Sequence, residues 1–293
     1  MRSACIDIGS NTTRLLVAER SGAGLREVLA RRMFVPLVDG TSGAIGLETM
    51  TVLASVVAAH AALAREAGAE RIQAVATAAI RSAVNREALC AAVQRESGLP
   101  IRVLDDAEEA RLAFAGATSM IAAPPAGTIG VVDIGGGSSE IVAGTAAGGV
   151  DWYVSLRIGS GVLTERHVHG DPPTPDEIDT LRAEADAAFG RVAAPPMQRA
   201  YAVGGSATSL RRLCGDELSP TSLDTALALV ASWPVRDAAE RLDLARERVR
   251  LLPAGLILLR AACAALGGLP LAVARGGMRE GVLLEDFAGR GPA

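Results

Sequence analysis

Apolar residues along the 293-residue chain recur with two different periods. Short runs of β-branched and other apolar residues alternate with longer stretches in which apolar positions repeat every three or four residues, which favours an α/β architecture. The predicted strands cover residues 4–8, 14–19, 26–32, 72–76, 101–104, 129–134, 140–144, 150–157 and 200–203. The predicted helices cover residues 48–67, 85–97, 107–118, 175–192, 206–214, 223–232, 245–266 and 278–287.

One segment of the chain occurs twice. Residues 4–17 read ACIDIGSNTTRLLV and residues 130–143 read GVVDIGGGSSEIVA, so Asp7 recurs as Asp133, 126 positions later. In both copies an apolar strand ends in aspartate, turns through glycine or small residues, and re-enters an apolar strand. This pattern predicts the same strand-turn-strand hairpin in two similar domains, which face each other across a cleft.

The second copy of the hairpin lies near the middle of the chain. Pro124 and Pro125 precede it and mark a connection. We therefore expect an N-terminal domain over residues 1–123 and a C-terminal domain over residues 124–293. In this arrangement the closing helix, about 278–288, can pack back on the first domain.

Composition narrows the class of protein further. The net charge of -4 is too small and of the wrong sign for a general nucleic-acid or membrane-surface binder. All 29 basic residues are arginine, so a Walker A lysine and a Schiff-base lysine are both excluded. The four cysteines form no CxxC pair, which indicates neither a zinc knuckle nor a redox pair. The sequence at the N-terminus is not typical of a secretory signal, and we expect a cytoplasmic protein without a membrane span.

The glycine-rich turns indicate phosphate binding. Without a Cβ, backbone N–H groups can approach a ligand closely, and successive N–H groups form a concavity that binds anions. Asp7 and Asp133 would repel a phosphate, so a divalent cation that bridges carboxylate and phosphate, Mg²⁺, is expected beside them. A third small-residue turn, Gly204, Gly205 and Ser206, opens a predicted helix whose N-terminus can also bind an anion.

The motifs together resemble one known family. The matching segments are DIGSNTTRLLV at 7–17, ATAAIRSAVN at 76–85, LDDAEEARLAFAGA at 104–117, VVDIGGGSSEIV at 131–142, AVGGSATSL at 202–210 and RGGMREGVLLE at 275–285. They resemble, in order and over nearly the whole chain, the exopolyphosphatase and guanosine pentaphosphate phosphohydrolase (Ppx/GppA) family. That family belongs to the actin-like, or ribonuclease H-like, superfamily of acetate and sugar kinases, Hsc70 and actin. The resemblance implies two duplicated actin-like domains with a cleft between them.

The resemblance also implies an activity and roles for particular residues. The activity is exo-acting, magnesium-dependent hydrolysis of terminal phosphate from inorganic polyphosphate, or of the 5′-terminal phosphate of guanosine pentaphosphate. Glu109 matches the base that activates the attacking water, and Glu140 matches a glutamate beside that water or the metal. Asp133 matches the metal-linked aspartate, with Asp7 as its counterpart. Phosphate-binding positions are matched by Ser10, Asn11, Arg81, Gly135, Gly136, Gly137 and Ser138.

Plainer interpretations exist for several of these residues. Glu109 has charged neighbours and can be a solvated helix glutamate, while Arg81 near a helix start can form a surface salt bridge. His167 and His169 form an HxH without an accompanying ligand cluster, which argues against a metal site there. Where many members of that family read SLPLGAVRLTER, this chain reads SLRIGSGVLTER, so Val162 replaces the family's arginine and Arg157 replaces a proline. Either the positive charge has moved five residues upstream to Arg157, or Arg157 points away and the groove loses one polyphosphate contact, which favours a shorter substrate. The resemblance to short members of the family also implies a preference for short polyphosphate chains.

Two rival functions use the same motifs. A kinase or ATPase of the same superfold would need a nucleotide pocket at the third glycine turn, and the DAEEARL and DIGGGSSE segments match the hydrolase branch better. A sensor that binds guanosine tetra- or pentaphosphate without hydrolysis is the second rival, and the presence of both Glu109 and Glu140 argues against it. A homodimer is compatible with the resemblance, although no segment of the sequence specifies an interface.

Overall fold

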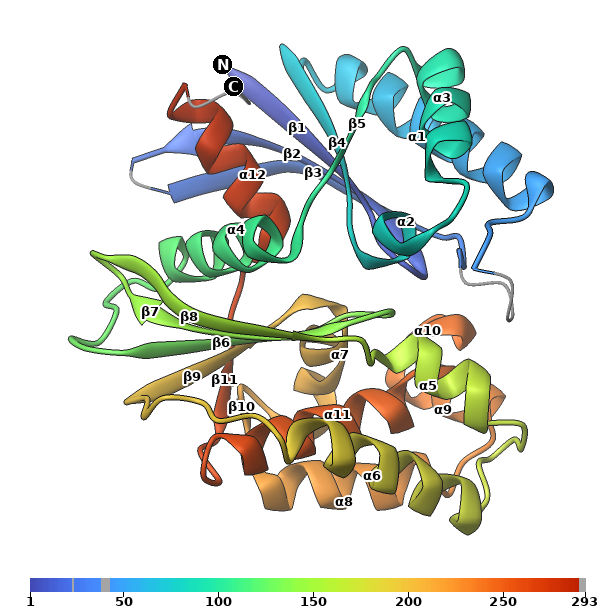
Figure 1. Cartoon of the computed structure of the whole chain (residues 1–293), viewed down its shortest axis with the longest axis vertical. Coiled ribbons are helices and arrows are strands. Elements are labelled where there is room, and N and C mark those ends of the chain that lie inside the picture. Colours follow the sequence, from blue (N-terminus) through green and yellow to red (C-terminus); the bar gives the residue numbers. More distant parts are fainter. Residues whose placement is uncertain (23, 38–42, 290–293) are drawn as a thin grey trace. The chain divides into compact units, whose positions relative to one another are not determined.

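The computed structural model describes residues 1–22, 24–37 and 43–289 (Figure 1). The chain divides into two compact units, which are described separately below. Unit 1 comprises Met1–Ala122 and Gly276–Ala293, and unit 2 comprises Ala123–Arg275. Each unit contains one mixed β-sheet, so the predicted α/β class with two duplicated sheets is confirmed.

Unit 1 is built on a five-stranded sheet in the order β3-β2-β1-β4-β5. Its strands are β1 (Arg2–Ile8), β2 (Thr12–Ser21), β3 (Gly24–Phe34), β4 (Arg71–Ala76) and β5 (Ile101–Val103). Its helices are α1 (Leu47–Glu66), α2 (Ala78–Ser82), α3 (Arg86–Ser97), α4 (Asp106–Ser119) and α12 (Met278–Phe287). Side chains alternate across the strands, so Ile6 and Leu15 pack with the α1 and α3 side, whereas Cys5 and Leu16 pack with α4 and α12.

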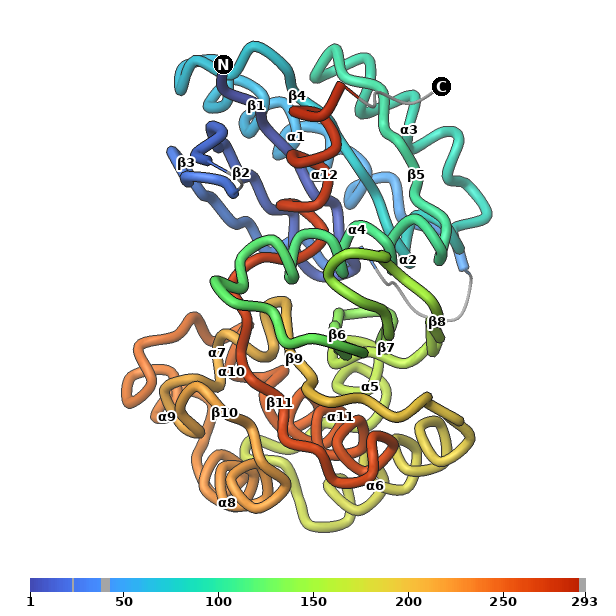
Figure 2. Tube along the Cα trace, turned by 90° about the vertical axis from the view of Figure 1, so that its left-hand side faces the viewer, coloured from blue at the N-terminus to red at the C-terminus, as the bar shows by residue number. Residues whose placement is uncertain are grey.

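The last helix, α12, packs against α4 and β1, as both views show (Figures 1 and 2). Gly116 of α4 and Gly281 of α12 allow the two helix backbones to touch. A Cβ on Gly116 would overlap the carbonyl of Gly277, and a Cβ on Gly281 would overlap the carbonyl of Leu112. These two glycines therefore set how closely α12 approaches the helix that carries Glu109.

Unit 2 is built on a six-stranded sheet in the order β10-β11-β9-β6-β7-β8. Its strands are β6 (Ile129–Ile134), β7 (Ser139–Thr145), β8 (Gly149–Leu156), β9 (Arg199–Val203), β10 (Glu217–Leu218) and β11 (Leu271–Val273). Its helices are α5 (Ser160–His167), α6 (Pro175–Phe189), α7 (Gly204–Cys214), α8 (Pro220–Val230), α9 (Val235–Leu242), α10 (Arg246–Arg250) and α11 (Leu252–Ala265). The helices bury one face of the sheet around the apolar helix α11 (Figure 1).

The two sheets repeat the same strand connections. In unit 1, β1 pairs antiparallel with β2 and parallel with β4. In unit 2, β6 pairs antiparallel with β7 and parallel with β9. The repeated sequence segment thus forms the same central hairpin in both sheets.

Several elements differ from the sequence prediction. The single helix expected over 245–266 is wrong, because α10 ends at Arg250 and α11 begins at Leu252 with Pro253 in its first turn, where proline's missing N–H is tolerated. Helices α2, α5 and α9 and strands β10 and β11 were not predicted, and each is short. Among the described helices, α1 alone is long and apolar enough to cross a membrane by length and composition. Its buried residues pack in the core of unit 1.

Candidate functional site

The two hairpins close with the same turn. The amide of Gly9 donates to the carbonyl of Thr12 at 3.0 Å, and the amide of Gly135 donates to the carbonyl of Ser138 at 3.0 Å. In each turn the glycine lies against the carbonyl that it bonds, which leaves little room for a Cβ. The sequence repeat is therefore also a repeat of backbone geometry, and it places an aspartate two residues before each turn glycine.

Strand register brings different partners to the two aspartates. In unit 1, Asp7 lies opposite Arg14, which lies opposite Arg32 on β3. In unit 2, Asp133 lies opposite Glu140, which lies opposite Ser155 on β8. Directly opposite residues of antiparallel strands project from the same face of the sheet, about 4.5–5.5 Å apart at Cβ. We call these sets the unit 1 rung (Asp7, Arg14, Arg32) and the unit 2 rung (Asp133, Glu140, Ser155).

The unit 1 rung is rich in positive charge. Arg279 of α12 adds a third arginine, close enough to Asp7 and Arg32 to shift the pKa of each. Burial raises the pKa of Asp7, although Arg14 and Arg279 both act to lower it. Burial and the neighbouring charge of Arg279 lower the pKa of Arg32. The Glu280 carboxylate also acts on Asp7 and raises its pKa, but the three guanidinium groups outnumber the two carboxylates, so this part of unit 1 is suited to an anion.

The unit 2 rung is acidic. Glu140 is 3% exposed and accepts a hydrogen bond from Ser155 Oγ at 2.9 Å on its Oε1. Gly204 approaches Asp133 so closely that a Cβ there would overlap the Asp133 carboxylate. Gly204 also has φ +83°, in the left-handed region that favours glycine. Two carboxylates directly opposite each other repel, so this rung is suited to a cation.

The turn after Asp133 offers backbone donors to an anion. Its carbonyl groups are held by the start of α5: the Gly135 carbonyl accepts from the Ser160 amide at 2.9 Å, and the Gly136 carbonyl accepts from the amides of Gly161 and Val162 at 2.9 and 3.0 Å. Within the described part of the chain, the amides of Gly136 and Gly137 have no acceptor. Consecutive unpaired N–H groups in a turn form an anion-binding nest.

In the corresponding unit 1 turn, the carbonyls of Ser10 and Asn11 are bonded to the chain that follows β3. They accept from the amides of Leu37 at 2.8 Å and Val35 at 3.0 Å. The side-chain Nδ2 of Asn11 is buried and has no hydrogen-bond partner among the described residues. Because buried donors are normally satisfied, Nδ2 is a candidate contact for a ligand oxygen.

Arg81 and Glu109 form an ion pair. Arg81 Nη1 donates to Glu109 Oε2 at 2.9 Å and to the carbonyl of Leu104 at 2.8 Å, and its Nη2 pairs with Asp106. The Glu109 side chain is only 13% exposed, so it is not the solvated surface glutamate of the plainer interpretation. Glu109 lies in the first turn of α4, whose N-cap Asp105 forms a capping box with Glu108. The cap and the arginine together orient Glu109.

The third glycine turn is held by hydrogen bonds within unit 2. Gly204, Gly205 and Ser206 form the first turn of α7, as the sequence indicates. Ser206 Oγ donates to the Ile134 carbonyl at 3.0 Å, which ties this turn to the end of β6 beside Asp133. The hydroxyl of Ser206 is thereby committed to the backbone, so any anion contact of this turn falls to its amides.

The acidic rung fits the magnesium ion that the family resemblance implies. No group of three or more His, Cys, Asp and Glu in residues 1–22, 24–37 and 43–289 is arranged to hold a metal. Magnesium, however, is commonly held by one or two carboxylates together with substrate phosphates and water. Asp133 and Glu140 supply such a pair, whereas the arginines around Asp7 oppose a cation there.

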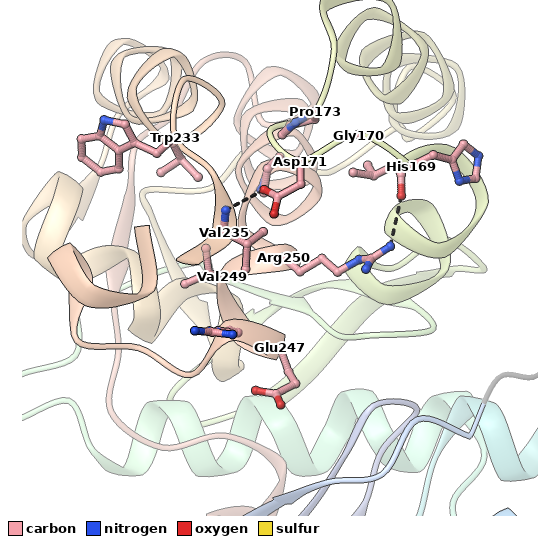
Figure 3. Close-up of a pocket in the computed structure, with 13 residues that line it drawn as sticks. His169, Gly170, Asp171, Pro173, Trp233, Val235, Glu247, Val249 and Arg250 are labelled. Atoms are coloured by element: carbon pink, nitrogen blue, oxygen red, sulfur yellow. Dashed lines mark hydrogen bonds between the residues drawn. The ribbon is translucent and has the colours of Figure 1, made fainter. Parts of the chain in front are cut away.

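A separate cavity lies in unit 2 (Figure 3). It has a volume of roughly 270 Å³ and is lined by residues of the α5–α6 connection, the α8–α9 connection and α10, including His169, Asp171 and Arg250. None of the predicted site residues lines it. His167 instead contacts Glu184 at 2.5 Å, so in the described residues the HxH pair does not form a metal site.

Four residues of the two rungs and their surroundings were not found from the sequence: Arg14, Arg32, Ser155 and Arg279. Arg14 lies inside the repeated segment, seven positions after Asp7, exactly as Glu140 follows Asp133, so the repeat itself carried a signal. The others come from strands and a helix distant in sequence. Only pairing and packing bring them to the site.

The repeated hairpins, the glycine turns and the two sheets define a two-domain protein of the actin-like superfold. A model of the Ppx/GppA phosphatase family matches residues 16–288. The chain belongs to this family.

Relatives and solved structures agree with that membership. Exopolyphosphatase 2 of Mycobacterium tuberculosis is 34% identical over 82% of this chain and 78% of its own length. Exopolyphosphatase 1 of Mycobacterium leprae is 28% identical over 98% of this chain and 90% of its own length. The crystal structure of the Aquifex aeolicus Ppx/GppA family member superposes with a TM-score of 0.80 at 28% identity, covering 100% of this chain and 99% of that one.

Proposed function

We propose that this protein is an exopolyphosphatase that removes the terminal phosphate of inorganic polyphosphate, with short chains preferred and magnesium required. The observation that carries the proposal is the opposite charge of the two rungs: arginines beside Asp7 suit a polyanion, and the Asp133 and Glu140 pair suits a divalent cation. A polyphosphate–magnesium complex presents both kinds of charge. The relatives named exopolyphosphatase support the same reaction.

In the proposed reaction a water oxygen attacks the terminal phosphorus and transfers its proton to Glu109. The bond from phosphorus to the bridging oxygen breaks, its electron pair stays on that oxygen, and the shortened chain leaves. Arg81, which donates to Glu109 Oε2 at 2.9 Å, would orient the carboxylate that accepts the proton. Amides of Gly136 and Gly137 stabilise developing charge on phosphate oxygens.

Magnesium, held by Asp133 and Glu140, would neutralise charge on the phosphate oxygens during the displacement. Asn11 Nδ2 and the amides at the start of α7 would add phosphate contacts. The arginines of the unit 1 rung, with Arg279, would hold the part of the chain that is not being hydrolysed.

Guanosine pentaphosphate is the alternative substrate, because it presents the same terminal phosphoanhydride. The test is phosphate release, with magnesium, from tripolyphosphate, long-chain polyphosphate and guanosine pentaphosphate in parallel. We expect release from tripolyphosphate, and a loss of at least ~100-fold in Glu109→Gln, the lower value for a general base. Glu96→Gln, an exposed glutamate of α3, is the matched control and should behave as wild type.

Each outcome of this assay has a distinct meaning. Release from guanosine pentaphosphate alone would reassign the substrate and keep the chemistry. Release from none of the three, with tight guanosine pentaphosphate binding, would replace the enzyme with a sensor. Wild-type turnover in Glu109→Gln would remove Glu109 from the role of base.

A further inference from the structure

Glu140 is a buried carboxylate that accepts a hydrogen bond from the neighbouring strand. It is 3% exposed, and a buried carboxylate needs hydrogen-bond donors to offset its lost hydration. Ser155 supplies one such donor, from Oγ to Oε1 at 2.9 Å. The contact joins β7 to β8 and belongs to unit 2 alone.

The backbone fixes this contact. Glu140 and Ser155 are paired directly in the antiparallel register of β7 and β8, so their side chains leave the same face of the sheet. The neighbouring hydroxyl, Ser139, points to the opposite face and donates to the Ile158 carbonyl at 2.6 Å. The strand register therefore places Ser155 of β8, and not Ser139 of β7, beside the Glu140 carboxylate.

We propose that Ser155 is a positioning residue for Glu140. By donating to Oε1 it restricts the rotamers of the carboxylate, and so orients Glu140 for the cation that Asp133 and Glu140 would share. This inference rests on the proposed function, because it assigns to Glu140 a part in metal binding. Ser155 itself contacts neither substrate nor metal in this proposal and acts only through Glu140.

The first experiment measures the magnesium response of Ser155→Ala. We expect the half-saturating magnesium concentration for phosphate release to rise about 10- to 100-fold, the range for loss of a residue that orients a metal ligand. KM for tripolyphosphate at saturating magnesium should stay within about 2-fold of wild type, since no phosphate contact is lost. Ser155→Thr keeps a hydroxyl and should restore most of the magnesium response.

A matched control separates positioning from stability. Ser97 is a buried serine of unit 1 whose Oγ donates to the Val93 carbonyl at 2.7 Å. The same Oγ accepts from the Leu99 amide at 3.1 Å. Ser97→Ala removes a serine hydroxyl together with its hydrogen bonds, as Ser155→Ala does, and we expect it to lower Tm without moving the magnesium response. An unchanged magnesium response in Ser155→Ala, or an equal change in Ser97→Ala, would overturn the proposal.

The second experiment does not depend on turnover. Tm is measured with and without magnesium for wild type, Ser155→Ala, Glu140→Gln and the double variant. We expect the two substitutions to be non-additive, and magnesium to raise the Tm of wild type more than that of Ser155→Ala. Additive Tm changes with equal magnesium shifts would reject the link between Ser155 and Glu140. If wild type releases no phosphate, the proposed function fails while this second test still decides the link.

Discussion

Arg14 and Glu140 occupy equivalent positions in the two hairpins, 126 residues apart, and each lies directly opposite the aspartate that ends the preceding strand. The two copies of the hairpin therefore carry side chains of opposite charge at this equivalent position. An arginine opposite Asp7 leaves the unit 1 rung positive, and a glutamate opposite Asp133 leaves the unit 2 rung negative. Under the proposed function, the positive rung would contact the phosphate chain and the negative rung would contact magnesium.

The first prediction concerns this division of charge. Arg14→Gln should raise KM for tripolyphosphate about 10-fold or more, because a charged hydrogen bond to phosphate contributes about 1.5–3 kcal/mol. The half-saturating magnesium concentration should change little. Steady-state kinetics over a magnesium series measures both, and a magnesium effect without a KM effect would contradict the division.

The second prediction concerns the displaced arginine. Arg157 directly follows β8, is exposed, and has no hydrogen bond or ion pair with the described residues. Val162, whose amide donates to the Gly136 carbonyl, stands where the family resemblance implies an arginine. Arg157→Ala should raise KM for polyphosphate several-fold and lessen its dependence on salt. Adding Val162→Arg to that variant should restore KM.

Arg191 provides the control for that charge relocation. It is also exposed, belongs to unit 2, and is likewise without a partner in the part of the chain that the structure describes. Arg191→Ala should leave KM unchanged. An equal rise in KM for Arg157→Ala and Arg191→Ala would show a general effect of net charge.

The third prediction concerns Gly204. Alanine there would be strained at φ +83° by about 1–2 kcal/mol and would also displace the Asp133 carboxylate. Gly215 has φ +78° and ψ -160°, a conformation that is essentially limited to glycine, with open space around its Cβ position, so Gly215→Ala strains the backbone without reaching a carboxylate. Both variants should lose stability in urea unfolding, and only Gly204→Ala should lose turnover, by about 10-fold or more. Equal turnover in Gly204→Ala and Gly215→Ala would show that the position of the Asp133 carboxylate does not affect the reaction.

The fourth prediction concerns the contact of α4 with α12. Gly281→Ala would force the two helices apart and should destabilise unit 1 by about 1–3 kcal/mol or more. A lower Tm and lower turnover should follow, because α4 carries Glu109. Gly24→Ala in β3, where a Cβ meets nothing closer than 3.9 Å, is the control and should be tolerated.

The fifth prediction is a pH dependence. Burial raises the pKa of Asp7 above its ordinary value of about 3.9, so the folded state holds this proton more tightly than the unfolded state. The stabilisation that the bound Asp7 proton gives the folded state is fully present below about pH 3.9, and it is lost as pH rises through the raised pKa of Asp7. Asp7→Asn cannot lose that proton and should be more stable than wild type at neutral pH.

The measurement for Asp7→Asn is the free energy of unfolding in urea across the acidic range. The difference between variant and wild type should grow as pH rises and then level off. Carboxylates with lowered pKa, such as Glu108, follow the opposite trend in both proteins and cancel in the difference. A difference that shrinks with rising pH would show that Arg14 and Arg279 lower the pKa of Asp7 by more than burial raises it.

Local patterns predicted the hairpins, most of the longer helices and the α/β class, because hydrophobic periodicity and glycine turns act over a few residues. The motifs also indicated the glycine turns and both aspartates. The interruption between α10 and α11 was missed although Pro253 stood in the sequence, since proline is compatible with a first helical turn as well as with a break.

The amino-acid sequence alone carried the duplicated turn, the phosphate chemistry that glycine and hydroxyl residues support, and the family to which the chain belongs. Tertiary structure decided which charges stand together: Arg32 beside Arg14, Ser155 on Glu140, and Arg81 on Glu109. Strand register and helix packing join residues far apart in the chain, and no local period or motif encodes such pairings. The charge of each rung, and the kind of ligand that the rung suits, can therefore be assigned only from the strand pairing in the tertiary structure.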